Sequence, residues 1–192
     1  MGLAIWEAGS QQMGGVSEKS NRRIAMAKET FTRMSTLLCN LNITMSTRLR
    51  FLDCYVLPIL KYGCESWLVS KAMEDRLQAT EMWFLSRMLR IPWTSHTTNE
   101  TVLHRAGRQR MLLRKIRKLQ LDFLGHCMRK DDLECLFLTG KINGRRDRGR
   151  QRTTYLQSIV AWTGMDNIKL LRLAKNKMDW HSMVAHVTGY GT

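Results

Sequence analysis

A short run of arginines holds the densest positive charge in the sequence. Five of the eight residues from 145 to 152 are arginine, and they are Arg145, Arg146, Arg148, Arg150 and Arg152. A guanidinium group donates two parallel hydrogen bonds to phosphate oxygens and also stacks on bases. Because such a run repels itself, it becomes ordered only against a counter-charge. We therefore expect these side chains to contact a polyanion; a nuclear-localisation signal and a disordered tether are the alternative interpretations.

A second group of basic side chains falls on a helix predicted over residues 108–129. Its expected buried stripe consists of Leu112, Leu113, Ile116, Leu119, Phe123, Leu124 and Cys127, with Met111, Leu121 and Met128 outside it. Gly125 is expected to weaken the last turns. The basic residues that we expect to contact phosphates are Arg110, Arg114, Arg117, Lys118 and Arg129. The alternative is the solvated face of an ordinary surface helix.

The total charge supports a polyanionic partner. The 192 residues contain 31 Lys and Arg against 16 Asp and Glu, which gives a net charge of +15. Residues 104–152 alone hold 15 of these basic residues and 5 of the acidic ones, so the excess is concentrated there. Surfaces of this kind bind DNA, RNA or anionic membranes. We expect RNA, DNA or both as partners.

Residue types that support metal or carboxylate chemistry are present, but their spacing is poor. No C-x-x-C pair occurs, and His181 and His186 point to different sides of a helix. The adjacent pairs Asp131-Asp132 and Glu74-Asp75 diverge on a helix and cannot converge on two metal ions. We therefore expect no metal, no cofactor and no catalytic residue in this chain.

The hydrophobic pattern predicts an all-α fold. Apolar residues recur at steps of three and four, and no segment alternates as a strand would. After an irregular segment at 1–16, helices are predicted at about 17–38, 46–60, 70–92, 108–129, 131–138, 153–162 and 167–187, the last with a break near Lys177. A further short helix is predicted to begin at Asn99. Pro58 should interrupt the second helix, which is apolar nearly all round and therefore expected to be buried. Residues 140–152 form a basic loop between helical modules.

The sequence also bears on the compartment. Its longest apolar run, residues 54–60, is interrupted by Pro58 and is far shorter than the ~20 residues that span a bilayer. Residues 1–20 lack the basic and apolar regions of a secretory signal. Five cysteines without regular spacing are typical of free thiols in a reducing environment. We expect an intracellular protein, in the nucleus or the cytoplasm, with no membrane partner.

Five segments in series resemble a known family. They are residues 22–31 (RRIAMAKETF), 57–67 (LPILKYGCESW), 82–93 (MWFLSRMLRIPW), 123–129 (FLGHCMR) and 148–156 (RGRQRTTYL). In this order and spacing they resemble the C-terminal part of the endonuclease–reverse transcriptase of non-LTR (LINE-type) retrotransposons, most like RTE-type elements. The resemblance covers about residues 17–187.

The resemblance implies a fold and a function. Residues 17–92 would correspond to a helical thumb, which in that family holds the template–primer duplex. Residues 99–187 would correspond to a basic helical tail that binds element RNA or target DNA. The family's palm aspartates and endonuclease have no counterpart in this sequence. The expected function is therefore that of a non-catalytic, nucleic-acid-binding remnant of a retrotransposon reverse transcriptase.

Two alternatives remain at this stage. The chain could supply a thumb in trans to a separately made reverse transcriptase palm. It could instead be a host interaction protein, or an unexpressed relic, with no role in nucleic-acid binding. Neither composition nor motif spacing decides between RNA and DNA.

The arginine run leads to a test by counterion release. We expect about three of its five arginines to contact phosphates at one time, so replacing all five with Gln should flatten the slope of log affinity against log salt by about 2 to 3 units. The fold should be unchanged because the loop is expected to be exposed. Filter binding at several salt concentrations measures the slope. A wild-type slope in the five-Gln variant would show that the run is a tether or a targeting signal.

Overall fold

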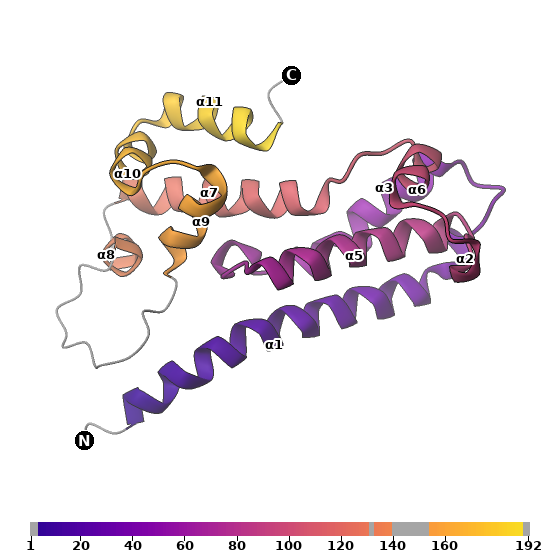
Figure 1. Ribbon diagram of the computed structural model, residues 1–192, viewed down its shortest axis with the longest axis horizontal. Helices are drawn as coiled ribbons and strands as arrows, with labels where there is room; N and C mark the ends of the chain where they lie inside the picture. The colour runs from indigo at the N-terminus through magenta and orange to yellow at the C-terminus, as the bar shows by residue number, and fades with distance from the viewer. Residues whose placement is uncertain (1–3, 131–132, 140–153, 190–192) are drawn as a thin grey trace. The chain divides into compact units, whose positions relative to one another are not determined.

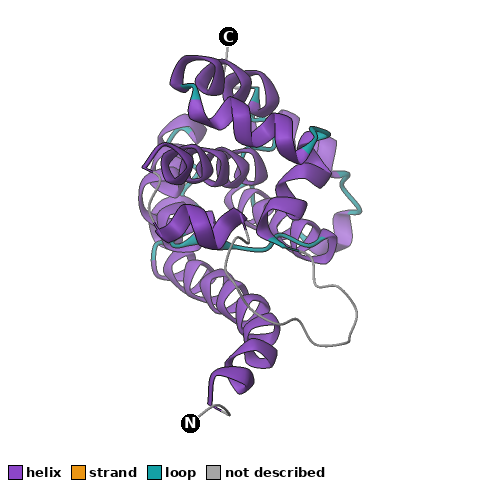
Figure 2. Cartoon of the chain, turned by 90° about the vertical axis from the view of Figure 1, so that its left-hand side faces the viewer, coloured by secondary structure: helices purple, strands orange, loops and turns teal. Residues whose placement is uncertain are grey.

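The structure is a computed structural model that describes residues 4–130, 133–139 and 154–189 (Figure 1). Within these residues the chain forms helices and connecting loops and no strand, so the all-α prediction is confirmed (Figure 2). The arginine run at 145–152 lies outside the described residues.

The chain divides into two compact units. The first consists of Met1–Cys64 and Lys71–Leu113, and the second of Glu65–Ser70 and Arg114–Thr192. This division falls later than the boundary at residues 92–99 expected from the sequence. Helix α6 (Asn99–Ala106) consequently belongs to the first unit.

The first unit begins with a long helix, α1 (Ala4–Arg33), followed by the single turn α2 (Ser35–Leu38). The helix contains residues 4–16, where the sequence predicted an irregular segment, so that prediction is wrong from Ala4 onward. The glycines at 14 and 15 cost about 1 kcal/mol each relative to alanine in a helix. Extending an existing helix is much easier than nucleating one, which is why two glycines do not end it.

The segment around Pro58 is an interrupted helix, as predicted. Helix α3 (Met45–Phe51) continues into a π-helical turn, η1 (Leu52–Val56), and then into α4 (Leu57–Lys61), with Pro58 in the first turn of α4. The expectation of burial on all sides is wrong, because Tyr55 is 55% exposed. One face packs against α1, and its buried residues are Leu52, Val56, Leu57 and Leu60.

Helix α5 (Lys71–Met88) lies beside α1 in the first unit (Figure 1). Phe31 of α1 meets Trp83 and Phe84 of α5, with ring centroids 5.3 and 5.2 Å away. A second apolar cluster joins α5 to α6 through Met82, Leu85, Val102 and Ala106. Two 3₁₀ turns lie in the connections on either side of α5: η2 (Cys64–Ser66) precedes it and η3 (Trp93–Ser95) follows it.

Helix α7 (Leu112–Lys130) starts in the first unit and provides the main core helix of the second. It packs with α8 (Leu133–Thr139), α9 (Tyr155–Thr163), α10 (Asn167–Lys175) and α11 (Lys177–Thr188). The predicted break near Lys177 occurs at Asn176.

The buried face of α7 differs from the predicted stripe. Leu121 and Met128, which the pattern placed outside it, are buried in the core of the second unit. Leu119, which the pattern placed inside it, is 37% exposed. The reason is that α7 is covered on more than one side, so no single stripe describes its core face.

Gly125 allows α11 to approach α7 closely. The indole of Trp180 is buried, and its Nε1–H donates a 3.2 Å hydrogen bond to the carbonyl of Leu121 on α7. A Cβ at position 125 would lie 2.6 Å from Cδ1 of this indole, well inside van der Waals contact. The glycine expected to weaken the helix is therefore needed for its packing.

Gly125→Ala should destabilise the second unit. Alanine gains about 1 kcal/mol of helix propensity, but overpacking typically costs about 1 to 3 kcal/mol and the lost Trp180 hydrogen bond about 1 kcal/mol more. We expect a net loss of about 1 to 3 kcal/mol, measured by denaturant unfolding with circular dichroism. His126→Ala, an exposed change on the same helix, is the control and should have little effect. Equal stability of the Gly125→Ala variant and the wild type would contradict the close-approach argument.

Candidate nucleic-acid interface

The structure distributes the basic residues predicted on residues 108–129 among different environments. Arg114 is exposed on α7. The ammonium of Lys118 lies 2.6 Å from the carboxylate of Asp122, one helical turn later. The guanidinium of Arg117 lies 4.9 Å from the ring centroid of Trp162. Lys118 and Arg117 therefore make contacts within the protein as well as carrying charge.

Two of the predicted residues have more specific partners. Arg129 Nη1 donates a 3.0 Å hydrogen bond to the carbonyl of Ala174, at the C-terminal end of α10, where helix carbonyls lack intrahelical donors. Arg110 precedes α7, belongs to the first unit, and donates a 2.6 Å hydrogen bond to Gln78 Oε1 on α5. The predicted residues thus fall in two different units, and Arg110 lies in a groove described next.

A groove of about 1480 Å³ runs along the first unit. Its walls come from α1, α5, the segment at 90–99 and the first turns of α6, together with Arg110. The lining contains five basic side chains, which are Lys28, Arg76, Arg87, Arg90 and Arg110. Its one carboxylate belongs to Asp75, which forms an ion pair at 3.3 Å with Lys71.

The partners of these five cations are neutral. Arg76 donates to the amide oxygen of Asn21 at 3.1 Å, and Arg90 Nε donates to the carbonyl of Cys39 at 3.0 Å. Within the described residues, none of the five cations is ion-paired with a carboxylate. Their charges are therefore not compensated inside the groove, and a polyanion would be attracted to it.

A partly exposed aromatic ring lies among the cations. Trp83 is partly exposed, with the ammonium of Lys28 5.3 Å and the guanidinium of Arg87 5.1 Å from its ring centroid. Such contacts hold long basic side chains in place, which reduces the entropy lost when they bind a ligand. The groove therefore interleaves basic and aromatic groups.

The backbone is strained at two residues that line the groove. Arg90 has φ 54° and His96 has φ 45°, and among the described residues these are the two non-glycine residues with positive φ. Both line the groove. At Arg90 the amide of Ile91 bonds back to the carbonyl of Ser86, the pattern with which α-helices end and for which glycine is preferred. Strain of this kind clusters at functional sites.

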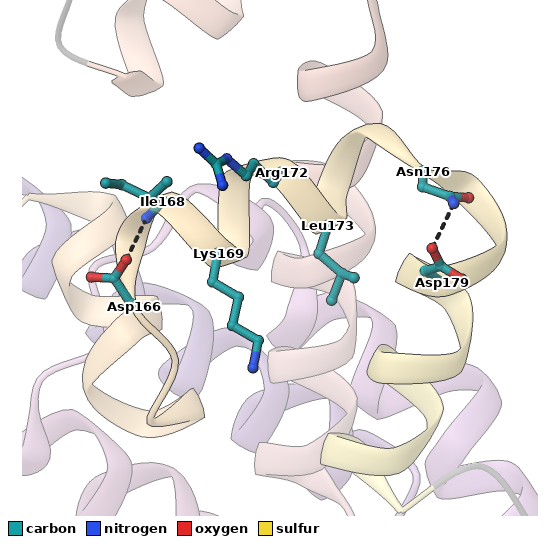
Figure 3. A pocket seen from close by; sticks show the side chains of 7 residues that line it. All are labelled: Asp166, Ile168, Lys169, Arg172, Leu173, Asn176 and Asp179. Carbon is teal, nitrogen blue, oxygen red and sulfur yellow. Dashed lines mark hydrogen bonds between the residues drawn. The ribbon is translucent and has the colours of Figure 1, made fainter.

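A smaller hollow of about 520 Å³ lies beside α10 and the start of α11 (Figure 3). Its two carboxylates serve the helix ends, since Asp166 accepts from the backbone amide of Ile168 at 3.1 Å and Asp179 accepts from the side-chain amide of Asn176, the residue before α11, at 2.5 Å. Lys169 and Arg172 balance them. This hollow is explained by helix capping and carries no net charge that would select a polyanion.

The described part of the chain also bears on metal and membrane binding. No cluster of three or more His, Cys, Asp or Glu residues there could hold a metal ion. Burial, together with a 3.6 Å hydrogen bond to Glu134, raises the pKa of the Cys127 thiol to about 11, so this thiol is protonated at neutral pH. No described helix is long and apolar enough to span a membrane.

Four groove residues were not predicted from the sequence: Lys28, Arg76, Arg87 and Arg90. For the residues on α5, the spacing in the sequence already indicated a shared helix face. Arg76, Trp83 and Arg87 on α5 are spaced by seven and four residues, which places them on one side of a helix. Lys28 and Arg90 belong to the same surface only through the packing of α1 and α5, and the sequence pattern does not contain that information.

A comparison with known proteins finds a partial match to a transposon-derived protein. The chain is similar to an uncharacterized transposon-derived protein of Caenorhabditis elegans, with 32% identity over 90 residues, which cover 44% of this chain and 32% of that protein. The chain thus matches about a third of the length of this curated relative. No protein-family model and no solved structure matches the chain.

The hydrogen bond from Arg129 to the Ala174 carbonyl predicts that this residue stabilises the second unit. Its charge alone would not predict this role. Arg129→Gln should remove the donor to the Ala174 carbonyl and lower the free energy of unfolding by about 1 kcal/mol. Lys130→Gln removes the same charge at the next, exposed position and should leave stability nearly unchanged. Thermal unfolding of both variants measures the difference. If the two variants melt together, the Arg129 bond contributes nothing to the second unit.

Proposed function

We propose that this chain is a nucleic-acid-binding segment derived from the reverse transcriptase of a non-LTR retrotransposon, and that it contacts phosphates without catalysing a reaction. The observation that carries the proposal is the groove of the first unit, with five cations whose described partners are neutral. Binding a phosphodiester backbone would neutralise this charge and release counterions.

Two further observations support the proposal. The five sequence segments that resemble the reverse transcriptase family extend over both units, and the similarity to a transposon-derived protein is consistent with that origin. The net charge of +15 provides a long-range attraction to nucleic acid over and above the groove. The arginine run at 145–152 would add contacts of the same kind.

The test compares two triple variants that remove the same charge. The groove variant carries Arg76→Gln, Arg87→Gln and Arg110→Gln. The control variant carries Arg22→Gln, Arg33→Gln and Arg105→Gln, at exposed positions outside the groove. Electrophoretic shifts with single-stranded RNA, hairpin RNA and duplex DNA are measured at several salt concentrations.

The groove variant should bind at least about tenfold more weakly and should flatten the salt slope by about 2 units, because each lost phosphate contact contributes about 0.7 on single strands and about 0.9 on duplex DNA. The control variant should keep the wild-type slope. Equal losses in both variants would show that only total charge matters and that the groove is not the site. No binding of any nucleic acid at low salt would contradict the proposed function itself.

A further inference from the structure

We infer that the groove of the first unit takes a single nucleic-acid strand, with a base stacked at Trp83, and does not take a duplex. This inference rests on the proposed function, because it assumes that the groove binds nucleic acid. It differs from the family resemblance, which on its own would suggest a template–primer duplex.

The placement of the cations favours a flexible strand. Lys28 comes from α1, Arg76 and Arg87 from α5, Arg90 from the turn after α5, and Arg110 from the segment before α7. They line one hollow from four segments of the chain. A duplex presents its phosphates on the outside of a stiff, convex rod, so it fits poorly into a hollow lined by cations from several segments. A single strand can bend to follow the hollow.

The aromatic residue among the cations, Trp83, also favours a single strand over a duplex. Proteins that bind single strands combine a basic groove with aromatic rings on which unpaired bases stack. Trp83 is fixed by edge contacts with Phe31 and Phe84, at centroid distances of 5.3 and 5.4 Å, yet it remains partly exposed in the groove. A base that stacks on this ring takes the place of the Lys28 or Arg87 cation that lies over it. In a duplex the bases are already paired and stacked, so such a ring has no base to receive.

The neutral partners of the arginines leave them able to turn toward phosphates. Arg76 and Arg110 are each held by one side-chain amide oxygen, of Asn21 and Gln78. Exchanging a neutral acceptor for a phosphate replaces an ordinary hydrogen bond with a charge-assisted one, which is stronger. These hydrogen bonds therefore hold the two guanidinium groups in place, and no carboxylate of the described residues competes with a phosphate for them.

The experiment measures fluorescence anisotropy of the full chain with a labelled single-stranded oligouridine, and separately with a blunt duplex of the same length. The variants are Trp83→Leu, Trp83→Phe, and the groove triple variant of Arg76, Arg87 and Arg110. The control is Tyr62→Leu, which removes an exposed aromatic ring that also carries a cation, Arg23 at 4.3 Å, but lies outside the groove. Circular dichroism melting checks that each variant is folded.

We expect the strand to bind at least about tenfold tighter than the duplex. Trp83→Leu should weaken strand binding about tenfold, the effect of one lost base stack, with little change for the duplex. Trp83→Phe and Tyr62→Leu should stay close to wild type. If Trp83→Leu does not fold, the groove triple variant decides, because it should abolish the preference for the strand.

Three results would overturn the inference. The first is duplex binding as tight as strand binding and lost in the groove variant, which would leave the proposed function intact. The second is strand binding that a folded Trp83→Leu variant does not weaken. The third is a complete lack of binding at low salt, which would remove the proposed function together with this inference.

Discussion

The first unit depends on a buried arginine that holds three chain segments together. Arg48 is 5% exposed, and its guanidinium donates to the carbonyls of Leu38, Ile43 and Met88, at 3.3, 3.0 and 2.6 Å. Leu38 ends α2 and Met88 ends α5, so both carbonyls belong to helix C-termini, where partial negative charge accumulates and donors are missing. Without Arg48 these ends would be buried and unpaired. The arginine therefore fixes where α5 stops, and with it the turn that forms one wall of the groove.

A second buried charge acts at the opposite kind of helix end. Glu81, also 5% exposed, accepts from the amides of Met111 and Leu112 at 2.9 and 3.0 Å, at the start of α7. Both buried charges are thus satisfied by backbone groups and not by each other. Because Glu81 binds backbone amides, its carboxylate does not neutralise a basic side chain of α5. The exposed arginines along α5 keep neutral partners, and the groove that they line therefore retains its positive charge.

Local properties were predictable from the sequence, and properties that depend on packing were not. The all-α class, the interruption at Pro58 and the break before Lys177 followed from periodicity and from residues that end helices. The start of α1 did not, because an existing helix extends through the two glycines at 14 and 15. The buried face of α7 did not, because it depends on what the helix packs against. The contacts of Arg117 and Arg129 reach α9 and α10, which lie some 45 residues further along the chain. The predicted contacts of residues 145–152 stay predictions.

The strained turn after α5 shows that local stability does not explain the groove. A non-glycine residue in the left-handed region costs roughly 1 to 2 kcal/mol, and Arg90 occupies the position at which helices favour glycine. Its Nε bond to the carbonyl of Cys39 recovers roughly 1 kcal/mol. The bond therefore does no more than offset the strain, and glycine would serve the backbone equally well. What glycine would not provide is the charge of the guanidinium, which lines the groove beside Arg87. Under the proposed function, the residue at this turn is thus better explained by its charge in the groove than by the stability of the fold.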